Sequence, residues 1–94
     1  MLESKIQRLL TEAILREFKL FPVLLKLSGE TGLPDMVVPL PGGRVVWLET
    51  KAANGRISPR QQLIYKRLSH VGHRVETVVS VAQALRVIKE ELNV

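Results

Sequence analysis

Two runs rich in apolar and β-branched residues, DMVVPL (35–40) and RVVWLETKA (44–52), lie on either side of Pro41-Gly42-Gly43. Each run is long enough for one strand, and a turn of proline and glycine between two such runs is typical of a β-hairpin. Pro39 has no amide hydrogen to donate, so we expect it at an edge or an end of its strand. The sequence therefore predicts an antiparallel pair, around which the rest of the chain must fold.

Three helices are predicted around this hairpin. The first covers the N-terminal segment, where apolar residues recur at helical spacing. Ser58 and Pro59 begin the second helix, because serine caps exposed amides and proline fits the first helical position. Gly72 is its expected end, and Ser80 caps the third helix. The residues expected on the buried faces are Ile6, Leu9, Leu10, Ala13, Ile14 and Phe18, then Leu63, Ile64 and Leu68, then Val81, Leu85, Ile88 and Leu92.

Two more segments have the composition of strands, FPVLLKLS (21–28), which ends at Gly29, and HRVETVVS (73–80). The predicted order is α-β-β-β-α-β-α, a mixed sheet flanked by helices, in one α/β domain over residues 1–94. The last strand follows a helix, so we expect it to pair in parallel through a crossover.

Charge and composition restrict the function. The chain carries a formal charge of +5 and has a pI near 10.1, which favours polyanionic partners, nucleic acid first. It has no cysteine, which excludes disulfides and zinc–thiolate sites. No apolar run reaches the roughly 18 residues that span a bilayer, and the N-terminus lacks the plan of a signal peptide. We therefore expect an intracellular protein with no membrane partner.

Acidic and basic residues interrupt the two hairpin strands. Alternate residues of a strand share a face, so Glu49 and Lys51 project together and Thr50 points the other way. With a turn at residues 41–43, Asp35 pairs roughly with Glu49, about 5 Å away at Cβ. Carboxylates that close repel each other unless a cation neutralises them, and oxygen ligands favour Mg²⁺ or Mn²⁺. The Thr50 carbonyl is a candidate third ligand.

Lys51 has a use beside such a metal ion. Its ammonium group could hold an attacking water or stabilise charge that develops on a phosphate. A Lewis acid, an activated water and a cation near the scissile phosphate are what metal-assisted phosphodiester hydrolysis needs. Taken singly, Asp35 could be a turn residue, and Glu49 with Lys51 a solvated pair.

Three motifs follow one another in the chain: GLPD (32–35), ETK (49–51) and GRISPRQ (55–61). Together they resemble the VRR-NUC domain, the virus-type replication and repair nuclease branch of the PD-(D/E)XK superfamily. The resemblance extends from the first helix to the SVAQALRVI helix (80–88). It implies a restriction-endonuclease-like core, which agrees with the element order above.

The resemblance also implies roles for single residues. Asp35 and Glu49 match the metal-binding carboxylates, Lys51 matches the catalytic lysine, and Gln61 matches a glutamine at the start of the next helix. Gln62 is the alternative, although the S-P-x-Q spacing favours Gln61.

The family site is completed by an acid on the first helix. Glu3 fits best, holding the metal directly or through water, because it shares the inward face with Ile6 and Leu10. Glu17 is the alternative, whereas Glu12 faces away among arginines.

The activity implied by the resemblance is that of a Mg²⁺- or Mn²⁺-dependent DNA endonuclease, a deoxyribonuclease without a small-molecule cofactor. The minimal members resemble Holliday-junction resolvases, so we expect a homodimer that cuts branched DNA, encoded by a phage or prophage and acting in the cytoplasm of a bacterial or infected cell. The alternative is a nucleic-acid-binding module that keeps the fold but does not cut. A purely structural phage protein is a third possibility.

The expected DNA contacts are Arg56 and Arg60, which flank the start of the helix that carries Gln61. We assign no catalytic role to Tyr65, the single tyrosine of the chain. The remaining basic candidates for phosphate contacts are Arg44, Lys66, Arg67 and Arg74.

Overall fold

The computed structural model describes residues 2–25 and 31–93. Its elements are α1 (Glu3–Phe18), β1 (Val23–Leu24), β2 (Met36–Pro39), the short 3₁₀ helix η1 (Pro41–Gly43), β3 (Val45–Thr50), α3 (Pro59–His70), β4 (Arg74–Val78) and α4 (Val81–Leu92). The predicted order of helices and strands is confirmed.

The four strands form one sheet in the order β1-β2-β3-β4. The predicted hairpin is confirmed, because β2 and β3 are antiparallel with Met36 opposite Leu48. The turn needs glycine, since Gly42 and Gly43 have φ angles of 81° and 76°. The predicted crossover is also confirmed, because β4 follows α3 and pairs in parallel with β3. The register therefore places residue 35 opposite residue 49, directly before the first residue of β2.

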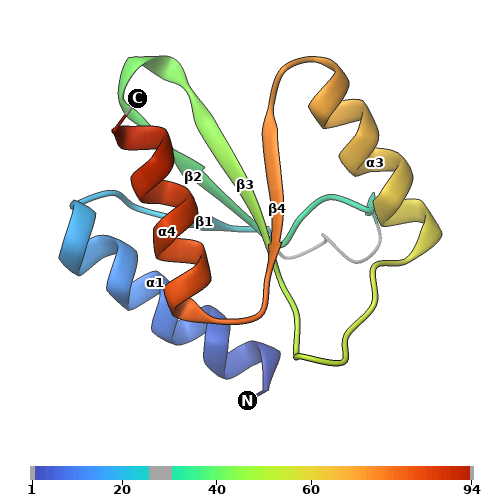
Figure 1. The fold of residues 1–94 in the computed structure, drawn as a ribbon, viewed down its shortest axis with the longest axis horizontal. Coiled ribbons are helices and arrows are strands. Elements are labelled where there is room, and N and C mark those ends of the chain that lie inside the picture. The colour runs from blue at the N-terminus through green and yellow to red at the C-terminus, as the bar shows by residue number, and fades with distance from the viewer. Residues whose placement is uncertain (1, 26–30, 94) are drawn as a thin grey trace.

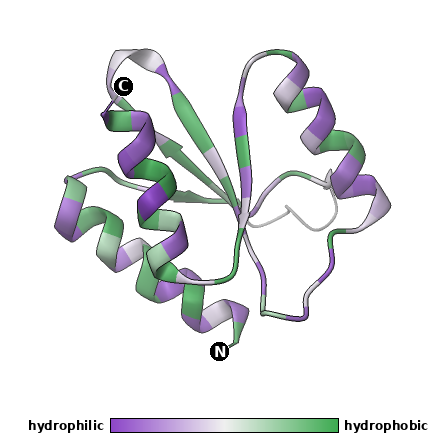
Figure 2. Ribbon diagram, in the orientation of Figure 1, coloured by the Kyte–Doolittle hydropathy of each residue, from purple (hydrophilic) through white to green (hydrophobic). Residues whose placement is uncertain are grey.

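One face of the sheet carries the hydrophobic core. Helices α1 and α4 pack together on this face, whereas α3 lies beyond β4 (Figure 1). Hydrophobic residues lie along β2 and β3 (Figure 2). None of the helices in residues 2–25 and 31–93 is long and apolar enough to cross a bilayer. The cluster of buried core residues is Leu10, Ile14, Met36, Val38, Leu40, Val46, Leu48, Val78, Ala84, Val87 and Ile88.

The predicted buried face of α3 is partly wrong. Leu63 is 48% exposed, Ile64 and Leu68 are half-buried, and the one buried side chain described in α3 is that of Gln61. The reason is that α3 packs along β4, an edge strand of the sheet, and among residues 2–25 and 31–93 it has no comparably extensive packing against another helix or strand. Its apolar residues therefore reach the sheet only in part.

The predicted strand over residues 21–28 is shorter in the structure. It comprises Val23 and Leu24, both exposed, which pair with Val37 and Met36 at the edge of the sheet. Pro22, which has no amide hydrogen, comes directly before it. The end of the prediction falls on residues 26–30, outside the described residues.

Both predicted serine caps are confirmed. The Ser58 hydroxyl accepts a hydrogen bond from the Gln61 amide at 3.1 Å, and the Gln61 side chain accepts one from the Ser58 amide at 2.9 Å. Ser80 accepts from the amide of Gln83 at 3.1 Å. Helix α3 ends at His70, and Gly72 has a φ of 97°, as expected of a residue that stops a helix. The reciprocal cap fixes the start of α3 beside the sheet.

Candidate active site

A cavity of about 500 Å³ lies at the end of the β2–β3 hairpin that is opposite its turn. Residues from α1, β1, the start of β2, the end of β3 and the start of α3 contribute to it. Elements far apart in the sequence thus converge on one hollow. Its lining is Glu3, Ser4, Gln7, Leu24, Leu25, Asp35, Glu49, Thr50, Lys51 and Gln61.

Hydrogen bonds between the two sides of the hairpin fix the side chains of Asp35 and Glu49. The Asp35 amide donates a hydrogen bond to Glu49 Oε1 at 3.1 Å. In return, the Thr50 amide donates to Asp35 Oδ2 at 3.2 Å, and the Thr50 hydroxyl donates to the same oxygen at 2.7 Å. These bonds continue the hairpin pairing through side chains. The predicted pairing of positions 35 and 49 is confirmed.

Both acids are withdrawn from the surface, since Glu49 is buried and Asp35 is half-buried. Glu49 is 4% exposed. Burial, as the largest cause, and the charge of Glu49 together raise the pKa of Asp35 to about 6, although the hydrogen bond from the Thr50 side chain opposes the shift. The pair therefore holds negative charge that its surroundings only partly compensate.

Lys51 lies beside Glu49, as the alternation along the strand predicted. Its Nζ is 3.5 Å from Glu49 Oε2, and the two side chains are 16% and 6% exposed. The backbone of Lys51 is fixed by a hydrogen bond of 2.9 Å from its amide to the Val78 carbonyl. The structure thus presents an ammonium group to the cavity next to a carboxylate.

Gln61 lines the cavity, and its side-chain oxygen is held by the cap of α3. The Ser58 amide is a donor, so the atom of Gln61 that faces it must be the oxygen. The side-chain nitrogen makes no hydrogen bond within residues 2–25 and 31–93, so its two hydrogens are available to an oxygen of water or phosphate. Gln62 is exposed and donates to the Ile57 carbonyl at 3.2 Å, outside the cavity. The geometry therefore favours Gln61 over Gln62.

Both first-helix acids are exposed, but Glu3 lines the cavity and Glu17 does not. The charge of Glu3 contributes to the raised pKa of Asp35. Within the described residues, no group of three or more acidic, histidine or cysteine side chains is arranged to hold a metal ion. Glu3 thus lines the cavity without forming a cluster of three acids with Asp35 and Glu49, a position from which it could contact a metal ion through a water molecule.

The residues present fit a divalent cation that prefers oxygen. Asp35 and Glu49 offer carboxylate oxygens to one cavity. The amide of Thr50 points towards Asp35, and the carbonyl of the same strand residue points to the same side. No histidine is among the described residues that line the cavity. Such an oxygen set is typical of Mg²⁺ and Mn²⁺ sites.

Tyr65 is a member of this site that the sequence prediction missed. Its hydroxyl donates to Glu49 Oε1 at 3.0 Å. Burial and the neighbouring Glu49 carboxylate raise the pKa of Tyr65, so the hydroxyl keeps its proton. Tyr65 follows Gln61 by four residues and shares its face of α3, a spacing that could have revealed it. Because Tyr65 binds Oε1 of Glu49, the other carboxylate oxygen, Oε2, is the one that lies near Lys51.

We expect Tyr65→Phe to weaken Mn²⁺ binding about tenfold, because a ligand that loses its hydrogen-bonded partner is less well oriented. Titration calorimetry measures this directly. The thermal unfolding midpoint serves as the control, and it should change little because the ring is kept. An unchanged Mn²⁺ affinity would show that Tyr65 does not position Glu49.

The other predicted residues lie outside the cavity. Arg56 and Arg60 are exposed at the start of α3 and do not line the cavity. Two of the remaining basic candidates form ion pairs with acids of α4. Arg44 lies 3.3 Å from Glu91, and Arg74 lies 2.8 Å from Glu90.

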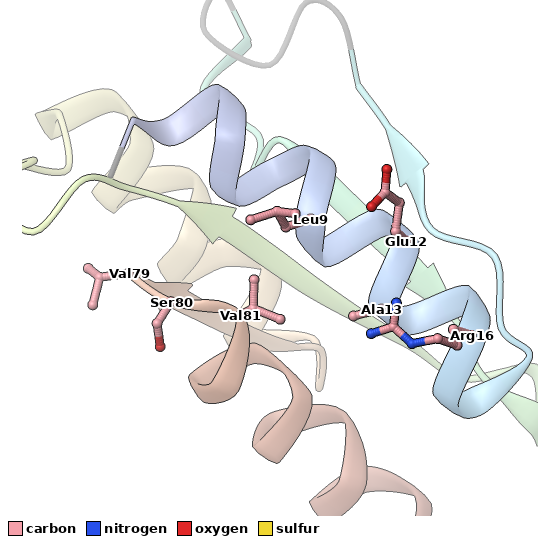
Figure 3. A pocket seen from close by; sticks show the side chains of 7 residues that line it. All are labelled: Leu9, Glu12, Ala13, Arg16, Val79, Ser80 and Val81. Carbon is pink, nitrogen blue, oxygen red and sulfur yellow. The ribbon is translucent and has the colours of Figure 1, made fainter.

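A second hollow, of about 420 Å³, lies between α1 and the connection from β4 to α4 (Figure 3). Its wall is mainly apolar, with Leu9, Ala13 and Val81, and it contains one acid, Glu12, and one base, Arg16. The prediction that Glu12 lies away from the site is confirmed. Since this hollow has no converging carboxylates, we place the chemistry in the first cavity.

Three comparisons place the chain among known proteins. A family model described as the VRR-NUC domain matches residues 5–82. "Putative nuclease p44" of Acyrthosiphon pisum secondary endosymbiont phage 1 is 38% identical over 47 residues, which is 50% of this chain and 50% of that protein. A solved structure described as a VRR_NUC domain has a TM-score of 0.77 and 27% identity, over 93% of this chain and 94% of that chain.

Proposed function

Because this chain belongs to the VRR-NUC domain family, we propose that it is a metal-dependent deoxyribonuclease that hydrolyses phosphodiester bonds. The observation that carries the proposal is the convergence of Asp35, Glu49, the Thr50 backbone and Lys51 on one cavity. The name of the phage relative supports the same activity.

Asp35, Glu49 and the Thr50 carbonyl would hold Mg²⁺ or Mn²⁺, with Glu3 in contact through water. When bound, such an ion supplies a Lewis acid for a phosphoryl oxygen and lowers the pKa of a water. The role of Tyr65 and of the Asp35 amide is to fix Glu49 Oε1, so that Oε2 remains available.

The remaining residues act on the water and the phosphate. The Lys51 ammonium holds the attacking water or stabilises the charge that grows on the phosphate oxygens. The Gln61 nitrogen donates to one of the same oxygens and orients it. During the reaction the water oxygen bonds to phosphorus and gives up one proton to solvent, one P–O bond breaks, and the leaving oxygen takes up a proton from solvent.

We further propose that the protein cuts branched DNA as a homodimer. The resemblance described above is one support. A second is the small hydrophobic core of this domain, because a second copy would bury more surface. Two sites related by a two-fold axis suit the cutting of two strands.

A panel of branched, flapped, nicked and plain duplex DNA tests the activity. We expect products with Mg²⁺ or Mn²⁺ and none after addition of EDTA, with branched DNA cut fastest. DNA that is shifted in a gel but never cut would support the non-cleaving binding module instead. A protein that neither binds nor cuts DNA would support the structural alternative. Light scattering on the same sample measures the oligomeric state.

A further inference from the structure

The net positive charge of the chain comes from one stretch of the sequence. Residues 51–75 contain six of the fourteen Lys and Arg residues and none of the nine Asp and Glu residues. The rest of the chain has eight basic residues against nine acidic ones and is nearly neutral. The net charge of +5 thus belongs to the loop after β3, to α3 and to the start of β4.

Contacts in the structure decide which of these six charges are free for a partner. Lys51 is paired with Glu49, and Arg74 forms ion pairs with Glu76, Glu90 and Glu91. Arg56, Arg60, Lys66 and Arg67 remain. All four are exposed, and within residues 2–25 and 31–93 none of them has an ion pair.

These four residues, here named the α3 basic surface, extend away from the cavity. Arg60 precedes Gln61, which lines the cavity. Lys66 and Arg67 lie about two turns further on, roughly 10 Å along the helix axis. Arg60 and Arg67 are seven residues apart and so lie on one side of α3. The first turn of α3 has no acid, so the positive end of its dipole adds to the field at the rim.

The cavity itself has the opposite charge. Asp35 and Glu49 face any phosphate that enters, and Lys51 offsets only part of their charge. An anionic substrate therefore needs cations at the rim to bring it to this site. The α3 basic surface begins next to the cavity with Arg60, and residues 51–75 contain no Asp or Glu, so a chain of phosphates that lies along this segment and ends in the cavity meets no acid before it reaches the site.

We propose that the α3 basic surface binds the phosphate backbone of the DNA substrate and directs it to the cavity. This inference rests on the proposed nuclease function and adds the docking side of the substrate. Each side chain supplies one phosphate contact, without reading the bases.

The test compares two triple variants that remove the same charge. The first is Arg60→Gln, Lys66→Gln and Arg67→Gln, and the matched control is Arg8→Gln, Arg16→Gln and Arg86→Gln on α1 and α4, where all three residues are also exposed. Fluorescence anisotropy with a labelled branched DNA in EDTA gives the affinity over a salt series. The parent supplies the reference slope of log affinity against log salt.

We expect the slope of log affinity against log salt to become less steep by about three in the α3 triple variant, roughly 0.9 for each lost phosphate contact. Its DNA affinity at low salt should fall at least tenfold. The control should keep nearly the parent slope. Single variants Lys66→Gln and Arg67→Gln repeat the test with less perturbation, each with an expected loss of about one unit. Equal losses in the two triple variants would overturn the inference, because they would mean that only net charge matters.

Failure of this inference and failure of the proposed function are distinguishable. If the parent cleaves DNA with Mg²⁺ or Mn²⁺ and the α3 variant keeps the parent slope, the docking side is wrong and the nuclease stands. If the parent binds DNA through the α3 basic surface but never cleaves it with either metal, the surface stands and the nuclease is wrong.

Discussion

Glu49→Gln is expected to lower the cleavage rate by at least about a thousand-fold, while the fold and DNA binding persist. Gln keeps an oxygen that can accept from the Asp35 amide and the Tyr65 hydroxyl, as Glu49 Oε1 does. Its other terminal atom is an NH₂ group, which cannot bind a cation where Oε2 stood. Loss of several kcal/mol of metal-ion stabilisation corresponds to a rate loss of this size.

Single-turnover cleavage with excess enzyme measures this effect. DNA affinity in EDTA should be equal to that of the parent or tighter, because the change removes a negative charge from the cavity. Glu12→Gln is the matched control, since Glu12 is exposed on α1 and lines the separate apolar hollow. A Glu49→Gln protein that cleaves at the parent rate would refute the placement of the active site.

Lys51→Met is expected to lower the cleavage rate by about a hundred- to a thousand-fold with Mn²⁺ affinity equal to that of the parent or tighter. Methionine keeps most of the side-chain volume but removes the cation that stabilises charge on the phosphate, a contribution of about this size. Because Nζ is 3.5 Å from Glu49 Oε2, its removal also leaves that carboxylate freer to bind a metal ion.

Calorimetry with Mn²⁺ separates the two possible roles of Lys51. Lys89→Met on α4 is the matched control, because it loses the same charge at an exposed position outside the cavity. A large fall in Mn²⁺ affinity for Lys51→Met would show that Lys51 maintains the structure of the site rather than the reaction.

The main elements of the fold could be predicted because their signals are local. Pro41-Gly42-Gly43 fixes the turn, and Ser58 and Ser80 fix two helix starts by bonds to residues three positions away. The pairing of Asp35 with Glu49 follows from that turn, since a hairpin register is set by the position of its loop. Two of the residues proposed for the site were thus placed opposite each other by a nearby turn.

Other features depend on contacts between distant segments. The exposure of Leu63 follows from the packing of α3 along an edge strand, and periodicity within the helix does not contain this information. Arg74 was a candidate DNA contact until the structure showed its ion pairs with α4, sixteen and seventeen residues further along the chain. Neutralised and free arginines look alike in the sequence.

The sequence by itself determined the order of the elements, the hairpin register and the alternation that sets Glu49 beside Lys51, because bonds among near neighbours control each of these. Only the tertiary structure decided that Tyr65 holds Glu49, that Gln61 lines the cavity, and which basic side chains stay unpaired within the described residues. Each of these depends on how α3 and α4 pack against the sheet, and that packing is the joint result of all buried surfaces rather than of any one segment.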